Sequence, residues 1–342
     1  MNDLDFLPAA LLPWFEKNAR DLPWRRDREP YHVWLSEIML QQTRVEAVKG
    51  YYERFLTALP DIEALANADP DRLTKLWEGL GYYSRVRNLH AAAKQIMETH
   101  GGTFPSDYAA IRALKGIGDY TAGAIGSICF DLPTPAVDGN VLRVISRITG
   151  DDRCVSEEKV KADIRDRLAQ LYPAGKCGQF TQALMELGAT VCLPNGAPLC
   201  ALCPCSANCR SCDGGWKLRP VKAAKKARRV EKRTVFVLRC GDCYAVRKRE
   251  KTGLLASLWE FPNVSGHLSP AEAIAQAEFW QTKPSELEKD VRRSHIFTHV
   301  EWDMHCFYLR CREMPEQFVW VSRADLEEKV ALPTAFRMFR DL

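Results

Sequence analysis

Hydrophobic residues recur at helical spacing through the first 215 positions of the chain, and at alternate positions after about residue 234. A spacing of three and four residues is typical of an amphipathic helix, whereas alternation is typical of a strand. Proline and glycine separate the helical segments from one another. The first part is therefore predicted to contain helices at residues 31–42, 76–97, 121–130, 141–148 and 180–191.

Strands are predicted in the second part of the chain. Residues 234–240 and 244–248 flank Gly241-Asp242, a pair typical of a two-residue hairpin turn. Residues 297–311 alternate between apolar and polar side chains, and His305 falls on the polar side, which is the pattern of a strand with one buried face. We therefore predict a multi-domain protein, with an all-α domain over residues 1–215, a linker over 216–233 and a smaller α+β domain over 234–342.

Composition narrows the class of protein. Hydrophobic residues make up 46% and charged residues 27% of the 342 positions, which suits a globular protein. No run of 18 apolar residues is present, and Asp3 and Asp5 stand where a signal peptide needs basic residues. We therefore expect no membrane association and a cytoplasmic protein.

The positive charge of the chain is concentrated in one segment. Residues 216–233 contain nine basic side chains and only one acidic one, Glu231. Such a run is usually a solvated linker. The alternative is a tether that lies along a polyanion and releases counterions from its phosphates.

Six of the thirteen cysteines lie between Cys192 and Cys212. This crowding suits a reducing compartment and a metal site better than a disulfide framework. Four thiols in the pattern C-x7-C-x2-C-x5-C could close around one metal centre; they are Cys192, Cys200, Cys203 and Cys209. The spacing leaves both zinc and iron–sulfur open, and Cys205 and Cys212 are spare candidate ligands.

Two carboxylates and a glycine turn are candidates for chemistry. Gly116 and Gly118 lie between helical segments and could expose backbone N–H groups to a phosphate, although an ordinary helix–helix turn is the simpler interpretation. Asp138 precedes a predicted helix, where aspartate commonly serves as an N-cap. Glu37 has mostly apolar neighbours at helical spacing, so burial would favour a protonated acid able to donate its proton.

The glycine turn, the aspartate twenty residues beyond it and the four-cysteine loop together resemble the helix-hairpin-helix DNA glycosylases that carry an iron–sulfur cluster. Within this group, the chain is most similar to the adenine DNA glycosylases of the MutY type. The segments that carry this resemblance are residues 34–43, 79–83, 137–140 and 182–188. The resemblance covers essentially the whole chain. It implies a six-helix barrel and a 4Fe-4S cluster held by the four cysteines of the loop 192–209. The first cysteine spacing is one residue longer than the family's usual six, and we expect the extra residue to bulge within Leu193–Leu199.

Members of this family remove adenine opposite 8-oxoguanine after flipping the adenine out of the duplex. The resemblance implies that Glu37 protonates adenine at N7 and that Asp138 stabilises the positively charged sugar. It also implies that Asn140 orients these groups beside Tyr120. Related glycosylase–lyases carry lysine where this chain has Tyr120, so the resemblance favours a monofunctional hydrolase over an endonuclease-III-like lyase.

The resemblance also implies a set of DNA contacts. Trp24, Arg25 and Gln182 would line the adenine pocket. Gln42 and Tyr82 would enter the base stack, with Thr43 and Leu80 near the opposite base. The backbone of Gly116 and Gly118 would contact phosphate.

The C-terminal segment resembles the Nudix-like domain of the same family. Its loop Phe297-Thr298-His299 matches the one that contacts 8-oxoguanine, although serine is frequent at the middle position. Because the chain lacks the glutamate-rich helix that would hold magnesium, pyrophosphate hydrolysis is not expected. The expected partner is duplex DNA with adenine opposite 8-oxoguanine or guanine, bound by a monomer at a bacterial nucleoid. A catalytically silent binder of damaged DNA is the alternative from another class.

Overall fold

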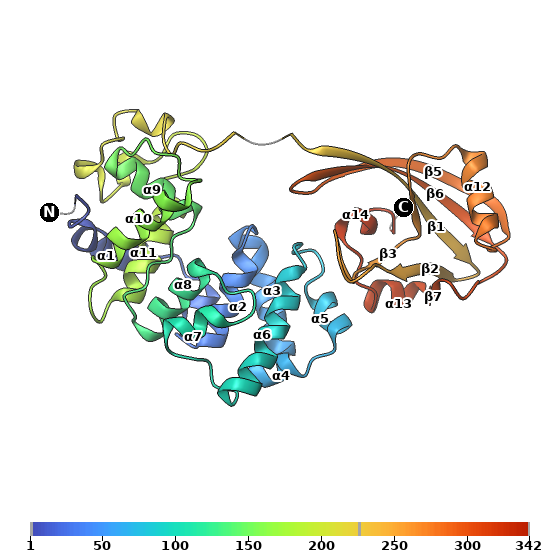
Figure 1. Ribbon diagram of the computed structural model, residues 1–342, viewed down its shortest axis with the longest axis horizontal. Coiled ribbons are helices and arrows are strands. Elements are labelled where there is room, and N and C mark those ends of the chain that lie inside the picture. The colour runs from blue at the N-terminus through green and yellow to red at the C-terminus, as the bar shows by residue number, and fades with distance from the viewer. Residues whose placement is uncertain (1–2, 225–226, 341–342) are drawn as a thin grey trace. The chain divides into compact units, whose positions relative to one another are not determined.

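The computed structural model describes residues 3–224 and 227–340 (Figure 1). The described residues form two compact units, the first made of residues 3–67 and 88–224 and the second of residues 68–87 and 227–340. The first unit is built from helices, and the described strands belong to the second. The predicted fold class, an all-α domain with an α+β domain, is confirmed.

Most of the predicted helices are present. The helices before the sheet are α1 (Leu7–Asn18), α2 (Pro30–Leu40), α3 (Val45–Ala58), α4 (Ile62–Ala66), α5 (Pro70–Leu76), α6 (Ser84–His100), α7 (Tyr108–Ala113), α8 (Asp119–Phe130), α9 (Gly139–Thr149), α10 (Glu158–Ala169) and α11 (Cys177–Thr190). The helix predicted over 76–97 is wrong at its start, because residues 77–83 form a loop. Gly79 and Gly81 take φ values of 102° and 70° in this loop, which glycine adopts without steric cost.

Helix α11 lies at the centre of the helical unit. It packs against α1, α8 and α9, and α8 packs in turn against α2. The core beneath α9 and α11 contains Ile145, Phe180, Leu184 and Leu187, all nearly or fully buried. Burial of these apolar faces fixes α2, α8, α9 and α11 against one another, and these helices carry the candidate catalytic residues.

The basic segment 216–233 is not a free linker, which corrects the predicted boundaries. Arg219 pairs with Asp152 at 2.8 Å, and the N–H of Val155 donates to the carbonyl of Val221 at 3.0 Å. Strand β1 already begins at Arg229. The charged side chains can stay in water while their backbone pairs with neighbouring strands. The end of the basic segment therefore does not coincide with the start of strand β1. Residues 225 and 226 of the predicted linker lie outside the described residues.

The second unit contains a seven-stranded sheet in the order β3-β2-β1-β6-β5, in which β4 also pairs with β1 and β7 with β2. Strands β1 and β6 are parallel and the other pairs are antiparallel. The strands are β1 (Arg229–Cys240), β2 (Cys243–Lys248), β3 (Trp259–Glu260), β4 (Asn263–Ser265), β5 (Pro284–Ile296), β6 (Val300–Cys311) and β7 (Val319–Ser322). The hairpin predicted at Gly241-Asp242 joins β1 to β2 and is confirmed.

Both faces of this sheet are covered, so the prediction of one solvated face on the 297–311 strand is wrong. One face packs Trp302 and Met304 against α13 (Arg323–Glu328) and α14 (Thr334–Arg337), and the other packs Phe307 against α12 (Pro270–Phe279) (Figure 1). His305, predicted to face solvent, is 5% exposed, and its Nε2 lies 2.6 Å from Asp290 Oδ2. The Asp290 carboxylate offsets part of the cost of burying this imidazole, whose Nδ1 has no partner among the described residues.

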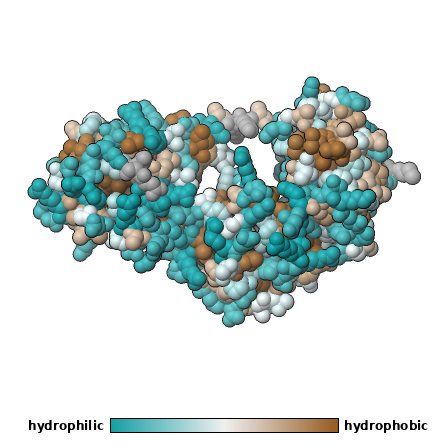
Figure 2. Space-filling view, turned by 180° about the vertical axis from the view of Figure 1, so that it is seen from behind, coloured by the Kyte–Doolittle hydropathy of each residue, from teal (hydrophilic) through white to brown (hydrophobic). Residues whose placement is uncertain are grey.

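The described helices include none long and apolar enough to cross a membrane. Figure 2 shows a surface that is mostly hydrophilic, with apolar residues in scattered groups. Scattered exposed apolar residues are normal for a globular protein.

Candidate functional site

A cavity of about 210 Å³ in the helical unit gathers residues from α2, α8, α9 and α11. Many of the residues singled out in the sequence line it: Trp24, Arg25, Glu37, Thr43, Tyr120, Asp138, Asn140 and Gln182. These positions span more than 150 residues of sequence, so their meeting is a property of the fold. The role of each residue stays a prediction.

Glu37 is a buried acid in this cavity. It lies on α2, which Pro30 starts at its first helical position, and it is 6% exposed. Burial raises the pKa of Glu37 to about 7, and the nearby charge of Asp138 adds to the rise. A hydrogen bond with Tyr120 and the charge of Arg25 act in the opposite direction. Near neutral pH, a large fraction of Glu37 therefore carries a proton that it can donate.

Tyr120 stands beside this acid as a neutral phenol. Burial raises its pKa well above the ordinary value, and the charges of Glu37 and Asp138 raise it further. Its side chain is hydrogen-bonded to Glu37. Tyr120 therefore fixes the position of the acid without competing for its proton.

Asp138 is the N-cap of α9, so the simpler interpretation of this residue is confirmed. Its Oδ1 accepts from the backbone N–H groups of Asn140 at 2.9 Å and Val141 at 2.8 Å, and its Oδ2 accepts from Asn140 Nδ2 at 2.7 Å. The start of a helix also favours negative charge. Because Asp138 lines the cavity as well, the capping bonds hold a carboxylate in fixed orientation at the site.

Sequence reasoning missed two residues of the cavity, Arg20 and Glu186. Glu186 is fully buried and accepts from Arg20 Nε at 2.6 Å and from Arg25 at 2.8 Å. Burial alone would raise its pKa, but the hydrogen bonds and charges of these arginines outweigh that effect and lower it. A single acidic residue in the otherwise uncharged helical segment 180–191 was the signal that could have found it.

The glycine turn joins α7 to α8 as a helix-hairpin-helix. Gly116 has a φ of 78°, and a Cβ there would lie 2.5 Å from the Cβ of Asn88, so the turn requires glycine. Gly118 is the N-cap of α8 with an extended backbone. The turn is confirmed, and phosphate binding by its N–H groups stays a prediction.

Two other predicted DNA contacts have strained backbones. Gln42 and Tyr82 have φ values of 56° and 44°, which are uncommon for residues with a side chain, and Tyr82 is 46% exposed. Strain of this kind persists where the surroundings enforce it and is frequent at functional sites. Leu80, by contrast, is buried, so its predicted contact with a base would need a local rearrangement.

The predicted base-sensing loop, residues 297–299, connects β5 to β6. Phe297 packs on Trp302 with ring centroids 4.9 Å apart, whereas Thr298 and His299 are exposed. Within the second unit, the Tyr82 hydroxyl lies 3.0 Å from Thr298 Oγ1. The threonine therefore keeps the hydroxyl of the more frequent serine in an accessible position.

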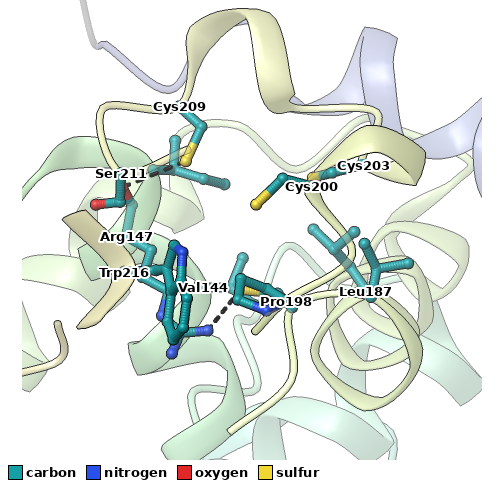
Figure 3. Close-up of a pocket in the computed structure, with 12 residues that line it drawn as sticks. Val144, Arg147, Leu187, Pro198, Cys200, Cys203, Cys209, Ser211 and Trp216 are labelled. Atoms are coloured by element: carbon teal, nitrogen blue, oxygen red, sulfur yellow. Dashed lines mark hydrogen bonds between the residues drawn. The ribbon is translucent and has the colours of Figure 1, made fainter. Parts of the chain in front are cut away.

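Cys200, Cys203 and Cys209 line one cavity together with Arg147 and Trp216 (Figure 3), and Cys192 lines the same cavity. Arg147 donates to Cys192 Sγ at 3.4 Å and can offset thiolate charge. Cys205 is packed in the apolar core, and Cys212 does not line the cavity. Four thiols around one cavity suit a metal ion or cluster bound by thiolates. In residues 3–224 and 227–340, however, no group of three His, Cys, Asp or Glu side chains is already arranged to hold a metal ion.

The long first cysteine spacing is accommodated by an irregular loop. The N–H of Leu199 donates to the carbonyl of Val191 at 2.9 Å, which closes the loop on itself, and Gly196 has a φ of 75° within it. The extra residue therefore lengthens a closed loop and leaves Cys192 and Cys200 on the same cavity.

Two protein-family models match separate parts of the chain. Residues 35–170 match the family described as "HhH-GPD superfamily base excision DNA repair protein", and residues 234–341 match the NUDIX domain family. A thermostable thymine-DNA glycosylase superposes with a TM-score of 0.56 and 28% identity, covering 62% of this chain and 97% of that one. An endonuclease III–DNA complex, 20% identical, has the same fold with a TM-score of 0.52 over 60% of this chain and 95% of that one. The fold and the site define a base excision repair protein of the helix-hairpin-helix class.

Curated relatives identify the family within this class. The adenine DNA glycosylase of Mus musculus is 32% identical over 99% of this chain and 79% of its own length. That of Buchnera aphidicola subsp. Acyrthosiphon pisum is 30% identical over 90% of this chain and 87% of its own length. The chain belongs to the adenine DNA glycosylase family, as the sequence resemblance predicted.

Proposed function

We propose that this protein removes adenine from duplex DNA by hydrolysing the N-glycosidic bond. The observation that carries the proposal is the cavity holding a buried Glu37, with a pKa of about 7, and the capped carboxylate of Asp138. Two carboxyl groups whose environments differ in this way can divide the roles of acid and charge stabiliser. Family membership supports adenine as the base removed.

In the proposed reaction Glu37 donates its proton to N7 of a flipped adenine. Protonation makes the base a better leaving group, and the C1′–N9 bond breaks with its electron pair going to the base. The sugar is left with positive charge, which the Asp138 carboxylate stabilises in the orientation that Asn140 holds. Water then adds to C1′ and releases its proton.

A monofunctional reaction fits the side chains around the cavity. A glycosylase–lyase needs an amine that forms an imine with the sugar. Tyr120 cannot supply one, and no lysine is among the described residues that line the cavity. The proposed nucleophile is therefore water, and the expected product is an abasic site in an intact strand.

We further propose that the second unit senses the base opposite adenine, with 8-oxoguanine preferred. The exposed Thr298 and His299 support contact with a base, and Tyr82 lies beside Thr298. Pyrophosphate hydrolysis by the NUDIX-type domain is not expected here, because the chain lacks the glutamate-rich helix that would hold magnesium. We propose that the protein acts on DNA as a monomer. The proposed location is a bacterial cytoplasm.

The proposed cofactor is a 4Fe-4S cluster held by Cys192, Cys200, Cys203 and Cys209. When bound, it would cross-link a loop that has little apolar core of its own. A brown protein whose visible absorption disappears in the Cys200→Ser variant would support the cluster. A colourless protein that contains zinc would contradict it.

One incubation separates the proposed enzyme from a silent binder of damaged DNA. A duplex with a labelled adenine opposite guanine or 8-oxoguanine is incubated with the protein and then treated with alkali, which cleaves abasic sites. We expect cleavage at the adenine only after alkali. Cleavage before alkali would indicate a lyase, and binding without cleavage would indicate the silent binder.

A further inference from the structure

Three cysteines lie side by side on adjacent strands of the second unit, far in sequence from the cluster loop. Cys240 ends β1 and is paired directly with Cys243, the first residue of β2. On the other side of β1 the parallel register pairs Arg239 with Arg310, so Cys311 of β6 is the next neighbour of Cys240. Cys240 and Cys311 belong to the same apolar cluster and therefore share one face of the sheet.

The register of Cys240 and Cys243 places their Cα atoms at a separation that a disulfide can span. Directly opposed residues in an antiparallel pair have Cα atoms about 4.5 to 5.5 Å apart and side chains on the same face. Disulfides span Cα separations of about 4.4 to 6.8 Å. The two-residue turn between them, with Gly241 at a φ of 59°, fixes this register and keeps the two thiols together.

Exposure distinguishes these two cysteines from the third. Cys240 and Cys243 are free and half-buried, whereas Cys311 is 4% exposed. Burial also raises the pKa of the Cys311 thiol, which lowers its thiolate fraction, and the thiolate is the reactive form. A small oxidant can therefore reach the hairpin pair more readily than Cys311.

We propose that Cys240 and Cys243 are a peroxide-sensitive pair that forms a reversible disulfide. One thiolate attacks an oxygen of the peroxide, so the O–O bond breaks and a sulfenic acid and water form. The second thiol attacks that sulfur and expels a second water, which leaves the S–S bond. In total two thiols and one hydrogen peroxide give one disulfide and two waters, and the two electrons lost by the sulfurs reduce the peroxide.

Peptide mass mapping of the full chain tests this proposal. Trypsin cleaves after Arg239 and Arg247, so both cysteines fall in the single peptide 240–247, and Cys311 falls in the dipeptide 311–312. The protein is reduced, treated with hydrogen peroxide, alkylated and digested. We expect most of the 240–247 peptide to escape alkylation and to be lighter by two hydrogens than its reduced form, and dithiothreitol to restore both alkylation sites. Because the ring is short, mass is a better readout than stability.

Two serine variants provide the matched comparison. Cys243→Ser should lose the mass change completely and leave Cys240 as a thiol or trappable sulfenic acid, whereas Cys311→Ser should keep the disulfide. Three results would overturn the proposal: full alkylation of both cysteines after peroxide, oxygen addition to them without a bridge, or a peptide 240–247 linked to 311–312.

Discussion

Glu37 and Glu186 are buried carboxyl groups on the same cavity, yet their neighbours shift their pKa values in opposite directions. Glu37 has Tyr120 and the like charge of Asp138 beside it, so burial dominates and its pKa rises to about 7. Glu186 has two arginines within hydrogen-bond distance, so it remains ionised. The first can therefore supply a proton, and the second can hold Arg20 and Arg25 at the wall of the cavity.

We predict that Glu186→Ala destabilises the protein more than Arg20→Ala does. Removing Glu186 leaves Arg20 and Arg25 without their shared anion, a loss of about 2 kcal/mol in the free energy of unfolding, because both arginines partly reach solvent. Removing Arg20, whose side chain is 36% exposed, leaves Glu186 still paired with Arg25. Urea unfolding of both variants measures the difference in the free energy of unfolding. Equal losses of stability in the two variants would contradict this explanation of how Glu186 holds Arg20 and Arg25.

The two glutamates also show what sequence could reveal about single residues. Glu37 was found because its apolar helical neighbours lie within four residues of it. The partners of Glu186 lie 166 and 161 residues away, so no local pattern encodes the ion pairs. The same limit applies to His305, whose buried state depends on Asp290 in the neighbouring strand β5.

At the scale of elements, helix α9 combines a structural and a proposed chemical role in one residue. Asp138 caps the helix through two backbone N–H groups, and the same carboxylate lines the cavity. Asparagine is about as good an N-cap as aspartate but carries no charge. Substitution can therefore separate the two roles.

We predict that Asp138→Asn keeps the stability of the wild type within about 0.5 kcal/mol while adenine excision is lost. Asp138→Ala should lose excision and also about 1 kcal/mol of stability, because the cap disappears. Thermal unfolding and single-turnover excision of the two variants provide the measurements. An active Asp138→Asn variant would show that the charge is not needed.

Element boundaries were less predictable than the elements themselves. The helical period continues across residues 76–83, but two glycines with positive φ interrupt the helix there. Strand β1 begins inside the basic segment, because backbone pairing with β6 from Arg229 onward does not depend on the charge of the side chains. Both errors occur where tertiary pairing or backbone conformation overrides the hydrophobic pattern.

At the scale of the whole molecule, we assign the proposed chemistry to the first unit and the proposed recognition of the opposite base to the second. The sequence predicted this two-part organisation because the hydrophobic period changes from helical to alternating along the chain. It did not predict that residues 68–87 belong to the second unit, since that grouping is set by contacts distant in sequence.

We predict that the double substitution Thr298→Ala/His299→Ala lowers selectivity for 8-oxoguanine over guanine more than it lowers the excision step itself. Both side chains are exposed on the loop between β5 and β6, so the sheet should fold unchanged. The measurement is single-turnover excision from two duplexes that differ only in the base opposite adenine. Thr57→Ala, a substitution of an exposed helix residue, serves as a control. Unaltered selectivity in the double variant would remove the sensing role from this loop.

The most direct test of the proposed chemistry is the pH dependence of single-turnover adenine excision in the wild type and in Glu37→Gln. A general acid works in its protonated form, and the pKa of Glu37 is about 7. We therefore predict a wild-type rate that levels off at low pH and falls about tenfold per pH unit above the pKa. We also predict that Glu37→Gln still binds the duplex but excises adenine about 100-fold more slowly or worse, without this inflection. A Glu37→Gln variant with the wild-type rate, or a wild-type rate that stays constant through pH 9, would contradict the assignment of the proton donor.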